Sequence, residues 1–328
     1  MVRPDRPGYR AEMAAVQAAQ AERPDSARGE LQGRIALVFV QLFFGLFPLF
    51  GKWAMLEFSA RAVAGWRIAA GAAALLGVAA CLHGRRVLPR RADLLRLQAC
   101  ALLGVVLNML LFLEGLRRST AVNAGLLVGT IPVFTFLVAV AVRQERFSVS
   151  RGAGILLAFV GISLIFLQRG PDFTDETLSG NALMAINAAC YSVFLVAVRP
   201  LLSRYAPLVV IAWVFVLSSW TVPLFGWGEA FVPAGVSTRG WLSLSYVLVF
   251  PTVLAYVLNT FALSKVSAST TAVFIFLQPL IVVATGVLVL GEALLPVTLA
   301  AAVTTLAGVW LVIRRGAPGR IAPRGVAR

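Results

Sequence analysis

The distribution of apolar and polar residues along this chain predicts a series of membrane-spanning helices. Ten apolar segments of about 20 residues alternate with short polar connections. Each is long enough to cross a hydrocarbon core of about 30 Å, and none shows the alternation of a barrel strand. Backbone groups in lipid must bond internally, so each segment is expected to be helical. The expected segments are 35–56, 63–82, 97–116, 121–141, 150–168, 180–199, 207–227, 241–263, 268–289 and 294–313.

The chain also repeats itself at one fixed offset of 147 residues. Residues 107–161 have a twin at residues 254–308, and the offset holds upstream as well. The matched pairs include Trp66 with Trp213, Leu116 with Leu263, Ala121 with Ala268, Pro132 with Pro279, Glu145 with Glu292, and Gly161 with Gly308. A repeat of this length identifies two copies of one unit.

The two copies are expected to span residues 35–168 and 178–313, with five helices each. Because five is an odd number, the second copy must enter the membrane from the opposite side. The expected fold is an all-α integral membrane protein with ten transmembrane helices in two inverted five-helix repeats. Such repeats are typical of secondary transporters, in which the substrate binds near the midplane between the halves.

Composition supports this class. Hydrophobic residues make up 59% of the 328 residues and charged residues only 13%, far from the balance of a soluble domain. The net charge of +15 does not indicate a nucleic-acid partner, because the basic residues are dispersed between apolar runs. The single histidine and three cysteines lack metal-ligand spacing, so neither a metal nor another cofactor is expected. The expected partners are the lipid bilayer and a small-molecule substrate, and the oligomeric state stays open.

The basic residues predict the orientation. With the N-terminus inside, most of the 29 lysines and arginines fall in cytoplasmic pieces, as the positive-inside rule requires. The outer pieces carry only Arg61, Arg117, Arg118, Arg169 and Arg239. We therefore expect a protein of the cell (inner) membrane with both termini cytoplasmic. Residues 1–34 are expected to form a disordered tail, with room for a short helix around residues 11–21, and residues 314–328 a basic tail.

Several motifs resemble the drug/metabolite transporter superfamily, in its ten-helix EamA branch. They are FFGLFPLFGKW (43–53), GWRIAAG (65–71), EGLRRSTAVNAGLLVGTIPVFT (114–135), FPTVLAYVLNTFALSKVSAS (250–269), FLQPLIVV (276–283) and GVLVLGEAL (286–294). One departure is Phe43–Phe44, where many members have Trp before Gly. Members export or exchange amino acids, other metabolites or toxic compounds, so the resemblance implies transport without fixing the cargo.

Polar and aromatic residues near the expected midplane are candidates for the substrate cavity. Hydrogen bonds between helices are the alternative role for the polar ones, and packing or interface anchoring for the aromatic ones. The candidates are Phe44, Phe47, Trp66, Arg67, Asn108, Thr130, Asn187, Tyr191, Trp213, Thr252, Tyr256 and Gln278. Pro132 and Pro279 are expected to kink the centres of two helices, because a mid-helix proline removes a backbone donor. These kinks either give the halves a pivot or only adjust packing.

Charges inside spans are costly unless paired or wet. Lys52, Arg67 and Glu114 all lie toward the expected outer face. They are candidates for the edge of an outward vestibule, where Lys52 and Arg67 favour an anionic group on the cargo and Glu114 could take part in coupling. The alternatives are snorkelling for Lys52 and an ion pair of Glu114 with Arg117 or Arg118.

Two other features are expected to be structural. Glu145 and Glu292 each follow a helix end, where an anion opposes the helix dipole, so they are expected to cap neighbouring helix starts or bind a basic loop residue. On the second segment, Gly65, Ala69, Ala73 and Gly77 recur at four-residue spacing, which predicts close approach of another helix.

The leading function is a secondary transporter that exports a small metabolite, such as an amino acid or related compound, or a toxic molecule by alternating access. A flippase for a lipid-linked carrier and a non-transporting scaffold are alternatives. A membrane-embedded enzyme is disfavoured, because the chain has one histidine and no carboxylate at the expected midplane. The direction of transport and the coupling ion stay open.

Overall fold

The computed structural model describes residues 9–119, 121–167, 175–228, 230–281, 284 and 296–314, and every regular element in these ranges is a helix. The first half contains α1 (Tyr9–Ala54), α2 (Ala60–His83), α3 (Leu94–Ala101), α4 (Leu107–Arg118), α5 (Ala121–Val128), α6 (Ile131–Ala141) and α7 (Val149–Leu167). The second contains α8 (Asp175–Ala197), α9 (Arg199–Leu202), α10 (Pro207–Val216), α11 (Val222–Phe225), α12 (Thr238–Leu248), α13 (Ala255–Lys265), α14 (Ala268–Val273) and α16 (Pro296–Arg314).

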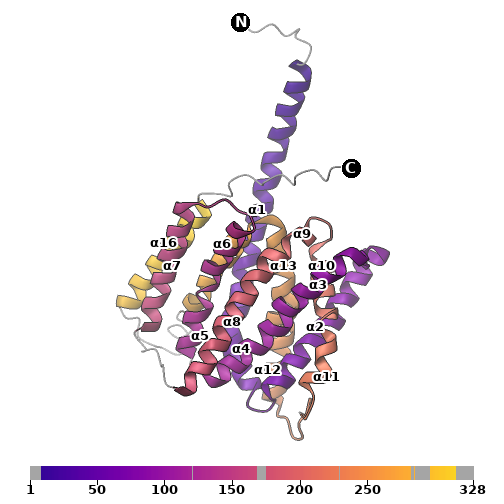
Figure 1. The fold of residues 1–328 in the computed structure, drawn as a ribbon, viewed down its shortest axis with the longest axis vertical. Coiled ribbons are helices and arrows are strands. Elements are labelled where there is room, and N and C mark those ends of the chain that lie inside the picture. The colour runs from indigo at the N-terminus through magenta and orange to yellow at the C-terminus, as the bar shows by residue number, and fades with distance from the viewer. Residues whose placement is uncertain are drawn as a thin grey trace.

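These helices form one bundle, in which α1 begins and α16 ends on the same side (Figure 1). Within the described ranges, six helical stretches are long and apolar enough to span a membrane, and four shorter apolar helices lie in the remaining expected segments. The side where α16 ends is called the terminal end, with residues 84–93, 142–148, 198–206 and 265–267. The opposite end holds residues 55–59 and 230–237.

The halves are interleaved rather than placed side by side. Helix α1 packs against α13 of the other half, and the matched helix α8 packs against α4. The matched pairs α2 with α10 and α7 with α16 pack against each other directly. This exchange of equivalent contacts is what a pseudo-two-fold axis between inverted repeats produces, so the expected inverted five-helix halves are confirmed.

Two helices contain a π-helical turn at the same position of the repeat. One covers Leu102–Val106, between α3 and α4, and the other covers Val249–Leu254, between α12 and α13. A π-bulge shifts the backbone hydrogen-bond pattern and is frequent at functional sites. Gly104 and Pro251 occupy equivalent places in the two bulges, and both carbonyls take part in the centre described below.

The helix is interrupted shortly before each of the two prolines that were expected to kink it, and the kinks themselves stay predictions. Helices α5 and α6 are separated by Gly129 and Thr130, and Pro132 lies in the first turn of α6. In the second half, a 3₁₀ turn at Phe274–Phe276 interrupts the helix shortly before Pro279. A proline is tolerated in the first turn of a helix because its missing donor has no partner there.

The start of the chain differs from the sequence-based expectation. Helix α1 begins at Tyr9 and extends beyond the bundle (Figure 1), whereas a disordered tail was expected up to residue 34. Residues 10–22 are rich in Ala, Glu and Gln, which are strong helix formers. Residues 315–328, expected as a basic tail, lie outside the described residues.

Candidate functional site: a polar cluster between the halves

The centre of the bundle holds a buried arginine. Arg67 lies on α2 and is 3% exposed. Its Nε donates to Thr252 Oγ1 at 2.8 Å, and its Nη2 donates to the Pro251 carbonyl at 3.4 Å. The guanidinium carbon also lies 4.8 Å from the centre of the Phe47 ring. Arg67 therefore joins α2 and α1 of the first half to the π-bulge of the second.

Tyr256, one turn after that bulge, makes the reciprocal connection. Its hydroxyl donates to the Gly104 carbonyl at 3.1 Å and lies 3.4 Å from Asn108 Oδ1. Gly104 must be small, because a Cβ there would lie 2.3 Å from the Phe194 ring. Each bulge thus offers a carbonyl to a side chain of the other half, Gly104 to Tyr256 and Pro251 to Arg67.

Amide side chains extend the cluster to α8. Asn187 Nδ2 donates to the Asn108 carbonyl at 2.7 Å, and Asn259 Nδ2 donates to the Tyr191 hydroxyl at 3.3 Å. Phe44 packs edge-on against Tyr256, with 6.4 Å between ring centres. We define the central cluster as Phe44, Phe47, Arg67, Asn108, Asn187, Tyr191, Thr252, Tyr256 and Asn259. It draws on α1, α2, α4, α8 and α13, so both halves are needed to build it.

The structure does not bring every sequence candidate into this cluster. Trp213 Nε1 donates to the Val87 carbonyl at the terminal end, at 2.6 Å, and Trp66 Nε1 donates to the Phe231 carbonyl at the opposite end, at 2.8 Å. These matched tryptophans fasten each half to a loop of the other. The Thr130 hydroxyl donates to the Leu127 carbonyl, a local contact at the break between α5 and α6.

Gln278 likewise forms a separate contact. Its Nε2 donates to Gln41 Oε1 at 2.7 Å, so this pair joins the proline-containing helix of the second half to α1. Sequence reasoning did not single out Gln41 or Asn259. Asn259 follows Tyr256 at the three-residue spacing of a helix face, and that spacing is a signal that could have identified it.

The charged candidates near the opposite end have different surroundings. Glu114 accepts hydrogen bonds from Arg117 at 2.9 Å and Arg118 at 3.5 Å, the ion pairs that the sequence offers as its alternative role. Glu114 and Arg117 also line a cavity of about 630 Å³ beside residues 55–61. Lys52 lies on α1, but its side chain lies outside the described residues, so its expected role with Arg67 in attracting an anionic group of the cargo stays a prediction.

Another carboxylate links the halves at this end. Ser237, at the start of α12, donates to Glu57 from both its backbone N–H and its hydroxyl. Hydrogen bonds to the ionised form hold the pKa of Glu57 below its usual value of about 4.5, with a smaller contribution from Arg239. The carboxylate is therefore ionised at neutral pH, and the contact depends on that charge.

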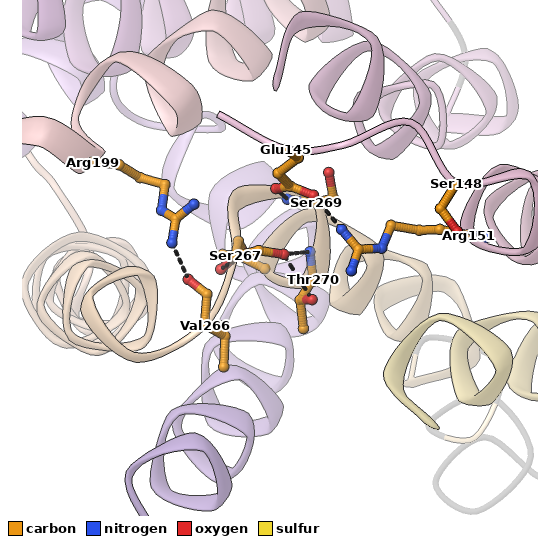
Figure 2. A network of polar contacts seen from close by, with 9 residues as sticks. Glu145, Ser148, Arg151, Arg199, Val266, Ser267, Ser269 and Thr270 are labelled. Atoms are coloured by element: carbon orange, nitrogen blue, oxygen red, sulfur yellow. Dashed lines mark hydrogen bonds and ion pairs between the residues drawn. The ribbon is translucent and has the colours of Figure 1, made fainter. Parts of the chain in front are cut away.

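At the terminal end, Glu145 of the first half reaches the start of α14 in the second (Figure 2). Its Oε1 accepts from the Ser269 N–H at 3.1 Å, and its Oε2 forms a buried ion pair with Arg151. Glu145 thus both caps a neighbouring helix and binds a basic residue, as expected. Its repeat partner Glu292 lies outside the described residues.

Further polar contacts cross between the halves at the terminal end. Asp93 accepts from Arg204 Nη1 and from the Tyr205 hydroxyl, each at 2.7 Å. Gln144 Nε2 donates to the Val196 carbonyl at 3.0 Å. In the part of the chain that the structure describes, no group of three or more His, Cys, Asp or Glu side chains could hold a metal ion.

Comparisons with known proteins agree with this arrangement. The EamA-like transporter family matches twice, over residues 31–167 and 178–314. An uncharacterized transporter of Archaeoglobus fulgidus is 27% identical over 86% of this chain and 98% of its own. A probable terminal-alkyne amino-acid exporter of Streptantibioticus cattleyicolor is 28% identical over 76% of this chain and 82% of its own.

A solved crystal structure has a similar fold. It superposes with a TM-score of 0.73 at 16% identity and covers 88% of this chain and 98% of that one. The two family matches cover almost all of the helical core, one in each inverted half. The chain therefore belongs to the EamA-like transporter family of the drug/metabolite transporter superfamily, and it is a multi-pass membrane transporter.

Proposed function

We propose that this protein exports a small metabolite, an amino acid or a related compound, by alternating access at the central cluster. The observation that carries this proposal is a buried polar cluster built from both halves around Arg67 and Tyr256. Inverted-repeat transporters bind substrate at the interface of the repeats, where relative rocking exposes it to each side in turn. The amino-acid exporter among the relatives favours this cargo class and this direction.

The orientation belongs to the same proposal. Most lysines and arginines of the loops lie at the terminal end, which the positive-inside rule assigns to the cytoplasm. Both termini are then cytoplasmic, and the cavity beside Glu114 opens outward. The helix interruptions just before Pro132 and Pro279 lie at matched positions of the repeat and are suited to act as hinges.

Transport by purified protein in lipid vesicles tests this function. We expect at least one labelled amino acid, related metabolite or antibiotic to cross the membrane chemically unchanged. Tyr256→Phe removes one hydroxyl from the cluster and is expected to slow transport about two- to tenfold, the effect of one hydrogen bond. Ser245→Ala removes an exposed hydroxyl of α12 and serves as the control.

The outcomes separate the alternatives. Chemical conversion of the solute would indicate an enzyme, and movement of lipid-linked carriers alone would indicate a flippase. If no solute moves while the vesicles contain folded protein, the transport proposal is wrong. If Tyr256→Phe and Ser245→Ala behave alike, the central cluster is not the substrate site.

A further inference from the structure

We propose that the central cluster selects its cargo by a carboxylate, which binds the guanidinium of Arg67. This inference rests on the proposed transport function and names the substrate class of that site. Among the described residues, the hydrogen-bond acceptors of Arg67 are both neutral: the hydroxyl oxygen of Thr252 and the carbonyl oxygen of Pro251. A buried cation held only by neutral groups remains poorly compensated, so an anionic ligand gains more there than in water.

The geometry leaves one edge of the guanidinium for such a ligand. Phe47 covers a face of the group, and Nε is engaged by Thr252. Nη2 makes only the long 3.4 Å contact with the Pro251 carbonyl, and Nη1 makes no hydrogen bond to a residue that the structure describes. The Nη1–Nη2 edge matches the spacing of two carboxylate oxygens, which arginine binds with two parallel hydrogen bonds.

Binding there also offers a route to couple the cargo to the halves. A carboxylate that takes Nη2 replaces the Pro251 carbonyl, which belongs to the π-bulge of the second half. The guanidinium itself belongs to α2 of the first half. When cargo binds, the contact between Arg67 and the second half is lost and a contact between Arg67 and the cargo replaces it. The cargo can then bind one conformation of the transporter more tightly than the other, as a ligand-driven conformational change requires.

The rest of the cluster disfavours cargo that carries a positive charge and no carboxylate. Its other polar side chains are amides and hydroxyls, at Asn108, Asn187, Tyr191, Thr252, Tyr256 and Asn259. Within the described residues, no Asp or Glu forms an ion pair with Arg67 or hydrogen-bonds the cluster. A cargo whose only charge is a cation meets repulsion from Arg67 without a counter-charge, whereas an amino acid can direct its ammonium to the neutral oxygens.

Matched solutes test this selectivity in wild-type vesicles. For each of several side chains, an amino acid, the corresponding 2-oxo acid and the corresponding amine without a carboxylate are offered as labelled solutes. We expect the amino acids or 2-oxo acids to be transported at least about tenfold better than the matched amines, the effect of one charged hydrogen-bond pair. Equal or better transport of the amines would overturn the carboxylate site while leaving transport itself established.

Variants then assign the preference to Arg67. Arg67→Gln is expected to abolish the discrimination between acid and amine, and Arg67→Lys to keep its direction at a lower rate, since lysine lacks the paired donors. Arg86→Gln removes an exposed charge just after the same helix and should retain the wild-type ratio. Unchanged discrimination in Arg67→Gln would overturn the assignment. If that variant does not fold, the Arg67→Lys rate and the wild-type ratio decide, and a vesicle preparation that moves nothing contradicts the proposed function as well.

Discussion

Arg67 and Glu145 are both charged residues buried in a largely apolar bundle, but their surroundings differ. Glu145, 8% exposed, has a full ion-pair partner in Arg151 and a backbone donor in Ser269. Arg67, 3% exposed, contacts a hydroxyl, a carbonyl and an aromatic ring among the residues that the structure describes. A buried charge that has a counter-charge within the protein stabilises the fold, whereas a buried charge without one favours binding of a ligand of opposite charge. This contrast separates a structural charge from a candidate binding charge.

A stability measurement checks the structural role of Glu145. Glu145→Ala is expected to lower the free energy of unfolding by about 3–5 kcal/mol, because Arg151 would lose its buried counter-charge. Denaturant titration or thermal melting of the detergent-purified protein measures the change. Arg146→Ala, at an exposed neighbour, should change the value by less than about 0.5 kcal/mol. A Glu145→Ala protein as stable as the wild type would contradict this role.

At the scale of elements, helices α7 and α16 pack closely along small residues. A Cβ on Gly308 would lie 2.4 Å from the Ala158 backbone nitrogen and 2.6 Å from the Gly154 carbonyl oxygen. The small-residue stripe that the sequence indicates on α2 is closely approached at one end only. A Cβ on Gly65 would lie 2.5 Å from the Phe231 ring, whereas Gly77 has no atom within 4 Å of its Cβ position. Recurring small residues therefore allow close approach without requiring it, and the neighbouring helix decides which stripe is used.

This comparison predicts opposite effects of one substitution. Gly308→Ala is expected to destabilise the protein by about 1–3 kcal/mol, since the backbone of α7 must move away. Gly77→Ala has open space and is expected to be neutral or stabilising by up to about 1 kcal/mol, because alanine favours the helix. Melting temperatures of both variants check this. Similar melting temperatures would show that α7 and α16 separate without cost.

At the scale of the whole molecule, contacts between the halves exist at both ends. Asp93 meets Arg204 and Tyr205 at the terminal end, and Ser119 donates to Asn181 Oδ1, at 2.6 Å, at the opposite end. In alternating access, the contacts at one end must open while those at the other close. The proposed mechanism therefore requires the contacts at each end to break at a different stage of the transport cycle.

Disulfide locks test this requirement. In a background without the three native cysteines, two links are made: Asp93→Cys to Arg204→Cys with a reducible thiol-reactive cross-linker that spans their longer separation, and Ser119→Cys to Asn181→Cys by oxidation. Each link is expected to stop transport. Reduction should restore it, and each single cysteine variant controls for the substitution itself. Transport that continues with either lock closed would contradict rocking of the two halves and favour a fixed pathway.

Part of the site followed from the sequence. Phe44, Arg67, Asn108, Asn187, Tyr191 and Tyr256 were all expected near a substrate cavity, and the structure gathers them into one cluster. The position of each residue along its membrane-spanning segment was enough to identify it as a candidate. Whether they bind cargo stays a prediction, and so does the hinge role of Pro132 and Pro279.

Other candidates at suitable depth lie elsewhere. Trp213, Thr130 and Gln278 contact Val87, Leu127 and Gln41, respectively. Depth does not fix the rotation of a helix about its axis, and these spans are apolar on most faces. The direction of each polar side chain is therefore decided by which neighbouring helix packs against it.

By itself, the sequence determined the ten spans, the duplication, the inverted arrangement of the halves and the family. These properties depend on segment length, hydropathy and the internal repeat, all of which are visible in the order of residues along the chain. Only the tertiary structure decided that α1 begins at Tyr9, that matched π-bulges present Gly104 and Pro251 to the opposite half, and that Arg67 is buried among neutral partners. These depend on helix rotation and backbone hydrogen bonding, which the packing of the two halves sets.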